Sequence, residues 1–165
     1  MINDVYGLRK QGMLATAAKW KVPVVIMHMK GTPETMNENP QYNDVIKEIY
    51  EFLQNRIEAA TEAGLEQIIV DPGIGFGKKR EHDLTILARL GELKSLGCPI
   101  LIGPSRKSFI GGTTKLPVDE RLESTIAAAS VAVMNGANIV RVHDVKACKR
   151  ALMVVDAIRT HKRVT

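Results

Sequence analysis

Apolar residues along this chain fall into two alternating patterns: short continuous runs, and longer stretches with helical spacing. The runs are rich in β-branched residues, which is typical of strands buried on both faces. Residues 42–64 form the clearest helical stretch. Its apolar positions, three or four residues apart, include Val45, Ile49, Phe52, Leu53 and Ile57. This spacing predicts an amphipathic helix that ends at Gly64.

The same patterns predict five strands with helices between them. The predicted strands are residues 1–4 (the end of a strand), 22–29, 65–73, 98–105 and 137–144. The other predicted helices are residues 83–96, stopped by Gly97, 119–135 and 145–163, with a glycine-rich loop over 103–112. This alternation predicts an α/β fold with a parallel sheet and right-handed crossovers. Because no Gly/Ser linker interrupts the chain, we expect a single domain over residues 1–165.

Polar residues or glycines end each predicted strand. They are Asn3 and Asp4, His28, Asp71, Gly103 with Ser105, and Arg141 with His143. Sites of α/β barrels and open α/β sheets lie at the C-terminal ends of the strands. Residues two apart on a strand share a face. The residues that would share a face are Asn3 with Val5, Ile69 with Asp71, Met27 with Met29, and Ile139 with Arg141 and His143. We therefore infer that several polar types meet around one volume, although parity leaves the register between strands open.

The stretch DPGIGFGK, residues 71–78, follows the third predicted strand. Its glycine spacing matches neither the dinucleotide-binding fingerprint nor a Walker loop, and Asp71 would repel an anion. A buried carboxylate here could accept two parallel N–H donors from a heterocycle such as a 2-amino-4-oxo pyrimidine ring. Glycines at 73, 75 and 77 would let the backbone lie flat against that ring. The simpler interpretation is that Asp71 and the following proline begin a turn.

Two further segments carry candidate chemistry. GPSRKSFIGG, residues 103–112, is either a solvated basic loop or part of a site, where Lys107 would offer three donors to the ring carbonyl and a ring nitrogen. Lys107 shares nominal strand parity with Ser105. In RVHD, a lone histidine would be interpreted as a core residue, but Arg141 with His143 at a strand end favours an anion site. His28, His82 in the loop before a helix, and His161 in the tail are interpreted as ordinary structural residues.

Composition narrows the class of protein. The net charge of +5 is scattered and aromatic residues make up only 4%, so a nucleic-acid reader is excluded while an anionic small substrate fits. Cys98 and Cys148 are isolated and indicate reduced thiols. We see neither a signal peptide nor a long apolar span, so we expect a cytoplasmic protein that does not bind membranes. The sequence shows no Ser-His-Asp order, no set of zinc ligands and no pair of carboxylates. Nothing in it therefore requires a reaction in which a protein side chain is the nucleophile.

The segments INDV, MHMKGTPETM, DPGIGFGK, SRKSFIG and RVHDV, in this order and at these intervals, resemble the dihydropteroate synthases of the folate pathway. The likeness runs from Asn3 to about the end of the last helix. Pterin-binding methyltransferases share DPGIGFGK in looser form, whereas SRKSFIG together with RVHDV is more specific. The resemblance implies a (β/α)8 TIM barrel and a transferase that is a sulfonamide target. It would join 6-hydroxymethyl-7,8-dihydropterin pyrophosphate to p-aminobenzoate and release pyrophosphate.

The resemblance also implies roles for individual residues. The residues that would bind the pterin are Asn3, Val5, Met27, Asp71, Gly75, Gly103 and Lys107. Arg141 and His143 would bind the pyrophosphate, and Phe76 and Ser108 would form the p-aminobenzoate slot beside Lys107. The catalytic residues would be Lys107, Arg141 and His143. The resemblance further implies Mg²⁺, with no metal ligand in this chain, and a homodimer through residues 119–135 and 145–159.

The length of the chain departs from the family. A barrel of this class needs about 250 residues, whereas these 165 residues supply five βα units. The resemblance therefore implies that the first three units, with their flexible loops and a second pterin-binding aspartate, lie outside this sequence. Two alternatives stay open: a methyltetrahydrofolate-dependent corrinoid methyltransferase, and a fragment that binds pterin or merely packs without catalysis. SRKSFIG and RVH favour the synthase, because no anion leaves in methyl transfer.

Overall fold

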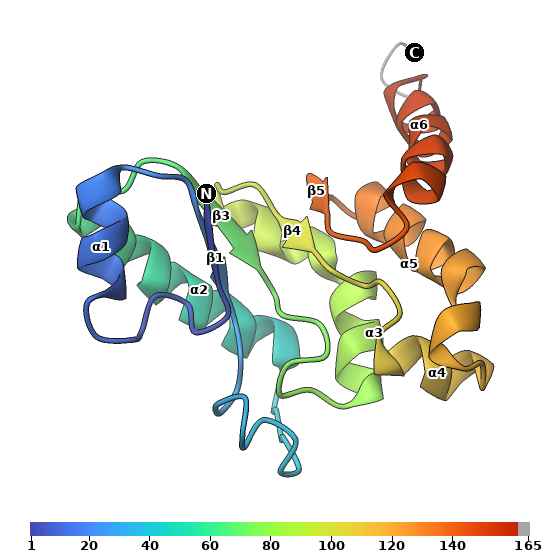
Figure 1. Cartoon of the computed structure of the whole chain (residues 1–165), viewed down its shortest axis with the longest axis horizontal. Coiled ribbons are helices and arrows are strands. Elements are labelled where there is room, and N and C mark those ends of the chain that lie inside the picture. Colours follow the sequence, from blue (N-terminus) through green and yellow to red (C-terminus); the bar gives the residue numbers. More distant parts are fainter. Residues whose placement is uncertain (162–165) are drawn as a thin grey trace.

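The computed structural model describes residues 1–161, and strands alternate with helices throughout (Figure 1). The strands are β1 (Ile2–Asp4), β2 (Val24–Met27), β3 (Ile68–Asp71), β4 (Leu101–Ile102) and β5 (Ile139–Val140). The α-helices are α1 (Met13–Trp20), α2 (Val45–Glu62), α3 (Arg80–Ala88), α4 (Ser108–Thr114), α5 (Leu122–Met134) and α6 (Val145–His161). Two short 3₁₀ helices are η1 (Leu90–Leu96) and η2 (Val118–Glu120). None of the helices described is long and apolar enough to cross a membrane.

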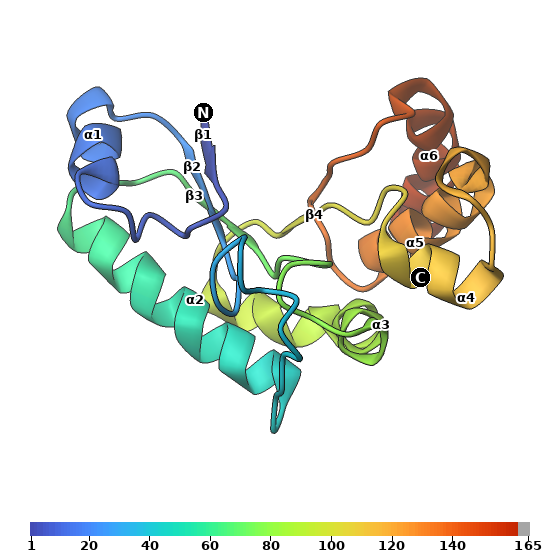
Figure 2. The ribbon, with the colours of Figure 1, turned by 60° about the horizontal axis from the view of Figure 1, so that its bottom comes forward.

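The predicted parallel arrangement is confirmed, and the strands follow chain order. β1, β2 and β3 form one sheet and β4 and β5 a second, all pairs being parallel. A single bridge between Val70 and Ile100 joins the two sheets. The order is that of a (β/α)8 barrel wall, with five of its units present. Figure 2 shows the helices arranged around an incomplete curve of strands.

Strand residues alternate between two environments, as the period of two requires. Ile26, Val70 and Ile102 are fully buried in the core that also contains Ile49 and Leu53 of α2. Residues of the opposite parity point away from this helix-covered core. They include Asn3, Val25, Met27, Ile69, Asp71 and Leu101, none of which belongs to the core cluster. This second face is the one that lines the inside of the barrel wall.

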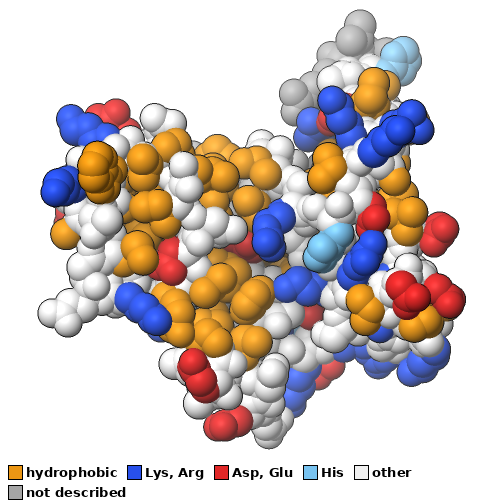
Figure 3. All heavy atoms as spheres, in the orientation of Figure 1, with side chains coloured by type: hydrophobic (Ala, Val, Ile, Leu, Met, Phe, Trp, Pro, Cys, Tyr) orange, Lys and Arg blue, Asp and Glu red, His pale blue; other side chains and the backbone are white. Residues whose placement is uncertain are grey.

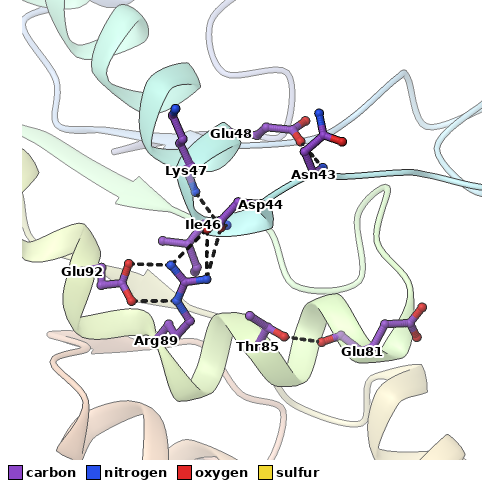
Figure 4. Close-up of polar contacts among 9 residues, drawn as sticks. All are labelled: Asn43, Asp44, Ile46, Lys47, Glu48, Glu81, Thr85, Arg89 and Glu92. Atoms are coloured by element: carbon purple, nitrogen blue, oxygen red, sulfur yellow. Dashed lines mark hydrogen bonds and ion pairs between the residues drawn. The ribbon is translucent and has the colours of Figure 1, made fainter.

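Helix α2 begins at Val45, three residues after the start of the predicted helical stretch. The Asp44 carboxylate accepts the backbone N–H groups of Ile46 and Lys47 at 2.9 and 3.2 Å, which caps the helix. Arg89 at the end of α3 reaches the same carboxylate at 3.2 Å and also pairs with Glu92 at 2.7 Å (Figure 4). Because these groups are substantially exposed, the ion pairs add little stability and mainly align α3 with α2. Gly64, with φ of 87°, follows the helix as expected.

The helix predicted over residues 83–96 is wrong in extent. Helix α3 starts earlier and ends at Ala88, and η1 then runs to Leu96 before the predicted stop at Gly97. At the end of α3, the Asn135 side chain donates a hydrogen bond to the Leu87 carbonyl at 2.7 Å. His82 accordingly lies inside α3, where Nδ1 accepts the Lys79 backbone N–H at 3.0 Å.

Other boundaries also differ from the predictions. All five predicted strands are longer than the paired segments, and η2 precedes a helix α5 that ends at Met134. The loop predicted over residues 103–112 is partly helical, because Phe109 and Ile110 of α4 are buried. A Cβ on its Gly111 would meet the Arg121 guanidinium, which would then have to shift from its hydrogen bonds to the Arg106 and Lys107 carbonyls. Residues 162–163, predicted to end the last helix, lie outside the described residues.

Candidate functional site

A small cavity lies at the C-terminal ends of the strands, where sites of this architecture are found. It is lined by Asn3, Val5, Met27, Asp71, Gly73, Ile74, Phe76, Gly103, Lys107 and Arg141. The structure thus places most of the predicted site residues, from all five strand ends, around one volume. The cavity measures about 40 Å³, so a bicyclic ring would lie against it and could not be enclosed by it.

A cavity of about 820 Å³ lies at the opposite ends of the strands. Pro23, Ile68 and Pro99 are among its lining residues, and the lining contains no lysine, arginine or histidine. It therefore lacks a cation that could bind an anionic substrate, whereas Asp71, Lys107 and Arg141 meet at the smaller cavity. Chemistry, and not size, identifies the candidate site.

Asp71 is a buried carboxyl group with only 8% of its surface exposed. Its Oδ1 accepts the Gly73 backbone N–H at 2.7 Å. Burial raises the pKa of Asp71 to about 6, and the Gly73 N–H, Lys78, Lys107 and Arg141 oppose that rise. Among residues 1–161, no group donates a hydrogen bond to Asp71 Oδ2. Every buried side-chain oxygen of these residues has a hydrogen-bond partner, so Oδ2 is not completely buried. Oδ2 is therefore accessible to a ligand.

The glycine loop after β3 packs directly on the backbone that follows β2. Gly73 and Gly77 have φ of 70° and 63°, in the left-handed region. A Cβ on Gly73 would collide with the His28 carbonyl, and one on Gly77 with the Lys30 backbone. Tyr42 donates its hydroxyl to the Gly77 carbonyl at 2.7 Å and covers the loop. Backbone packing by itself therefore accounts for glycine at both positions, and the predicted role beside a ligand ring stays a prediction.

Lys107 lies across the middle of the same loop. Its Nζ is 4.2 Å from the centroid of the Phe76 ring, and its Cδ would be 3.1 Å from a Cβ on Gly75. Burial lowers the pKa of the Lys107 ammonium, while Asp71 acts in the opposite direction. Ser108 is exposed as the first residue of α4 and does not line the small cavity. The ammonium is thus held against an aromatic face beside the Asp71 carboxylate.

The turn before Lys107 explains why strand parity does not apply there. Arg106 has φ of 58°, a left-handed conformation that costs about 1–3 kcal/mol in a residue other than glycine. Its backbone N–H donates to Thr125 Oγ1 at 3.1 Å, and its guanidinium pairs with Asp144 at 2.9 Å. Arg121 donates to the Arg106 and Lys107 carbonyls at 3.0 and 3.3 Å. Sequence patterns gave no signal for Thr125 or Arg121.

Arg141 and His143 follow β5 but differ in environment. The strand ends at Val140, before both residues, so alternation along a strand does not determine which way their side chains point. The Arg141 guanidinium lines the cavity and forms no ion pair with a carboxylate of residues 1–161. The exposed His143 lies beyond that lining, with Nδ1 2.9 Å from Ser105 Oγ. Figure 3 shows basic side chains and a histidine between the apolar surface over β1–β3 and the part built from α4–α6.

Two charged residues next to the cavity lining were not predicted from the sequence. Asp83 of α3 is 1% exposed and accepts the Gly75 N–H at 2.9 Å; burial raises its pKa to about 6. Lys78 donates to the Phe76 carbonyl at 2.9 Å and lies 3.0 Å from His28 Nδ1. His28 itself is 5% exposed, as expected for a core residue. An acidic residue on the inner face of a helix was the available signal for Asp83.

Comparison with protein families matches residues 1–143 to the family described as pterin binding enzyme. The dihydropteroate synthase of Escherichia coli (strain K12) is 43% identical over 164 residues, which are 98% of this chain and 58% of that protein. The dihydropteroate synthase of Synechocystis sp. is 45% identical over 162 residues, covering 96% of this chain and 56% of its own length. The chain thus spans a little over half the length of these relatives.

Solved structures show the same likeness. A Yersinia pestis dihydropteroate synthase with a sulfonamide drug superposes with a TM-score of 0.95 at 41% identity, over 97% of this chain and 59% of that one. A Thermus thermophilus dihydropteroate synthase in complex with 4-aminobenzoate gives a TM-score of 0.91 at 43% identity, over 95% of this chain and 65% of that one. The same Thermus protein has also been solved in complex with 6HMPPP.

Proposed function

The chain belongs to the pterin-binding enzyme family, and we propose that it forms the pterin-binding and pyrophosphate-binding wall of a dihydropteroate synthase. The observation that carries this proposal is the convergence of Asp71, Lys107 and Arg141 on one cavity at the strand ends. A carboxylate, an ammonium and a guanidinium at one place suit a ligand with an N–H edge, a carbonyl edge and an anionic tail. A pterin pyrophosphate has these three features.

Recognition of the ring follows from the hydrogen-bonding capacity of each group. Asp71 Oδ2 accepts from the amino-pyrimidine N–H edge while Oδ1 stays bonded to the loop. Lys107, which can only donate, meets the ring carbonyl and a ring nitrogen. The Asn3 amide contributes from the end of β1, and Val5 and Met27 offer apolar contact to the ring face. Gly75 and Gly103 complete the binding surface without side chains.

The reaction is a substitution at the methylene carbon of the pterin. The carbon–oxygen bond to pyrophosphate breaks, and the departing oxygen takes the electron pair. The amine of p-aminobenzoate then forms the carbon–nitrogen bond and loses a proton to solvent. Arg141 and His143 stabilise the charge that develops on the leaving group. Holding both substrates in line supplies much of the acceleration, which agrees with the absence of a protein nucleophile in this mechanism.

In this proposal the p-aminobenzoate slot extends toward solvent from the small cavity, which Phe76 and Lys107 line. Phe76 faces the Lys107 ammonium at 4.2 Å, so its ring can also contact a flat aromatic acid. Ser108 is exposed at the first position of α4, next to Lys107 in the chain, where its hydroxyl can reach the carboxylate. The second substrate therefore binds toward solvent, where this chain supplies only part of the wall.

We propose that the residues described here supply no magnesium site of their own. Mg²⁺ prefers carboxylate, carbonyl and water oxygens in octahedral geometry. Residues 1–161 contain no cluster of three or more His, Cys, Asp or Glu side chains that could hold a metal ion. The anion-binding side is formed by Arg141 and His143, which do not attract a cation. We propose that Mg²⁺ binds in the barrel units that this chain does not include, and that the complete protein is cytoplasmic.

Changing Arg141 to alanine tests the leaving-group assignment. We expect affinity for 6-hydroxymethyl-7,8-dihydropterin pyrophosphate to fall roughly 10- to 100-fold, because charge-assisted hydrogen bonds are lost. Affinity for 6-hydroxymethyl-7,8-dihydropterin should change less than about twofold, because that ligand lacks the pyrophosphate. Calorimetric titration of both ligands measures the difference.

Arg150→Ala serves as the matched control, since Arg150 is exposed on α6 and should affect neither ligand. Equal losses for both ligands in Arg141→Ala would contradict the assignment. A parallel assay separates the synthase from the corrinoid methyltransferase. Consumption of p-aminobenzoate supports the synthase, whereas methyl transfer from methyltetrahydrofolate to cobalamin would replace it.

We also propose a homodimer through residues 119–135 and 145–159. Exposed apolar side chains on α5 and α6 support it: Val131, Met134, Val145, Met153, Val154 and Ile158. Light scattering at tens of micromolar, on the longer protein that carries this chain, should give twice the mass of one polypeptide. Val154→Glu should shift the protein toward monomer, whereas Thr160→Glu on the same helix should not. A strictly monomeric wild-type protein would count against the proposal.

A further inference from the structure

Lys78 ends the glycine loop, and the proposed reaction gives it no part. Its Nζ donates to the Phe76 carbonyl at 2.9 Å and lies 3.0 Å from Nδ1 and 3.4 Å from the carbonyl oxygen of His28. Burial lowers the pKa of His28 to about 2, so its ring is neutral and Nδ1 is free to accept. The Lys78 ammonium therefore joins the backbone after β2 to the loop after β3.

The same two segments hold Asp71 in place. The His28 backbone N–H donates to the Asp71 carbonyl at 2.9 Å, which continues the β2–β3 pairing beyond the strands. Gly73 donates to Asp71 Oδ1 and packs beneath the His28 carbonyl. Lys78 connects the same two segments a second time, through the His28 side chain and the Phe76 carbonyl. A change at Lys78 would thus act on both segments that orient the carboxylate.

The charges around Asp71 come from three places in the fold. Lys78 acts from the glycine loop, Lys107 from the turn before α4, and Arg141 from the residue after β5, and each opposes the effect of burial on the Asp71 pKa. In the proposed function, Lys107 and Arg141 bind the ring and the pyrophosphate. Lys78 does not line the cavity, so its charge is not used by a ligand.

Lys78 has its own charged neighbours. Burial lowers its pKa to about 7, Asp83 of α3 and Asp71 act in the opposite direction, and Lys107 adds to the lowering. Two carboxylates therefore favour its charged form near neutral pH. Without Lys78, this part of the loop would contain two buried carboxyl groups with one fewer compensating cation.

We propose that Lys78 is a positioning residue that locks the glycine loop to the end of β2 and supplies the positive charge that keeps Asp71 ionised before the ligand arrives. The consequence for pterin binding rests on the proposed function. The effect on the Asp71 carboxyl group does not, because it exists in the unliganded protein.

The test measures the Asp71 carboxyl titration by ¹³C NMR in the folded, unliganded protein that carries this chain. Lys78→Met removes the charge and keeps an unbranched side chain. It should raise the Asp71 pKa by about one pH unit or more, the usual effect of losing a nearby opposite charge. Lys78→Arg should return the Asp71 pKa most of the way to its wild-type value. Lys47→Met, which removes a lysine exposed on α2, should leave Asp71 unchanged.

Titration with 6-hydroxymethylpterin provides the second readout. Affinity should fall as the pH drops through the Asp71 pKa, because the protonated acid no longer presents an ionised acceptor. In Lys78→Met this fall should begin at higher pH. If the Asp71 pKa rises by about one, binding at a pH below both pKa values should be roughly tenfold weaker than in the wild type. Lys78→Arg should return the profile toward that of the wild type.

An unchanged Asp71 pKa in folded Lys78→Met would overturn the proposal, even if the variant were less stable. If Lys78→Met does not fold, Lys78→Gln gives the same readout, because its amide can still donate to the Phe76 carbonyl without a charge. A raised Asp71 pKa in a protein that binds no pterin would support this inference and contradict the proposed function instead.

Discussion

Replacing Asp71 by asparagine should weaken 6-hydroxymethylpterin binding roughly 10- to 100-fold or more while leaving the glycine loop folded. Asparagine retains Oδ1 for the Gly73 N–H, which the carboxylate accepts at 2.7 Å. Its amide N–H₂ then replaces Oδ2, so a donor faces the donor edge of the ring. The loss appears directly in a calorimetric titration of the folded protein.

Glu62→Gln is the matched control, because it makes the same chemical change at an exposed position in the last turn of α2. Its pterin affinity should equal that of the wild type. If Asp71→Asn bound pterin within twofold of the wild type, Asp71 would not be the residue that reads the ring, and its role would be reduced to the turn that Gly73 completes.

These 165 residues expressed alone are expected to form no dihydropteroate and to lack a stable monomeric state. Within residues 1–161, β1 pairs only with β2 and β5 only with β4, so two parallel strand edges keep unpaired backbone groups. Uncovered edges of this kind promote association with other chains. Ile139 on the edge strand is 36% exposed, and the 40 Å³ cavity supplies only one wall of a pterin site.

A product assay and thermal unfolding of the lone chain measure both expectations. Addition of the barrel units found in the longer relatives, on the same chain or as a second polypeptide, should restore cooperative unfolding together with synthase activity. A soluble monomer that unfolds cooperatively and makes dihydropteroate would show that five units suffice.

The parts of the fold that depend on local periodicity could be predicted from the sequence. Ile49 and Leu53 recur at helical spacing because one face of α2 is buried, and Gly64 ends the helix through its backbone freedom. The limits of α3 could not be predicted, because Asn135 binds its final carbonyls from a position far along the chain. The limits of short strands such as β5 could not be predicted either, since pairing on one side does not alter the apolar pattern.

The residues of the site also separate into those that could be predicted from the sequence and those that could not. Asp71 and Arg141 could be proposed because strand ends are visible in the sequence and the family motifs mark them. Asp83 and Arg121 could not, because their effects pass through backbone groups of other residues. His143 shows the limit of parity: once β5 ends at Val140, alternation no longer predicts which way a side chain points.

The break between the two sheets has a thermodynamic consequence for binding. Asn3, Met27 and Asp71 belong to the three-stranded sheet, whereas Gly103, Lys107 and Arg141 follow the two-stranded one. The single Val70–Ile100 bridge is the only strand pairing between these parts within residues 1–161. A pterin pyrophosphate seated as proposed touches both parts and acts as a non-covalent cross-link. Part of the binding free energy of this ligand is then used to fix the two sheets relative to each other. A change that makes the barrel wall more rigid should therefore also raise the affinity for the ligand.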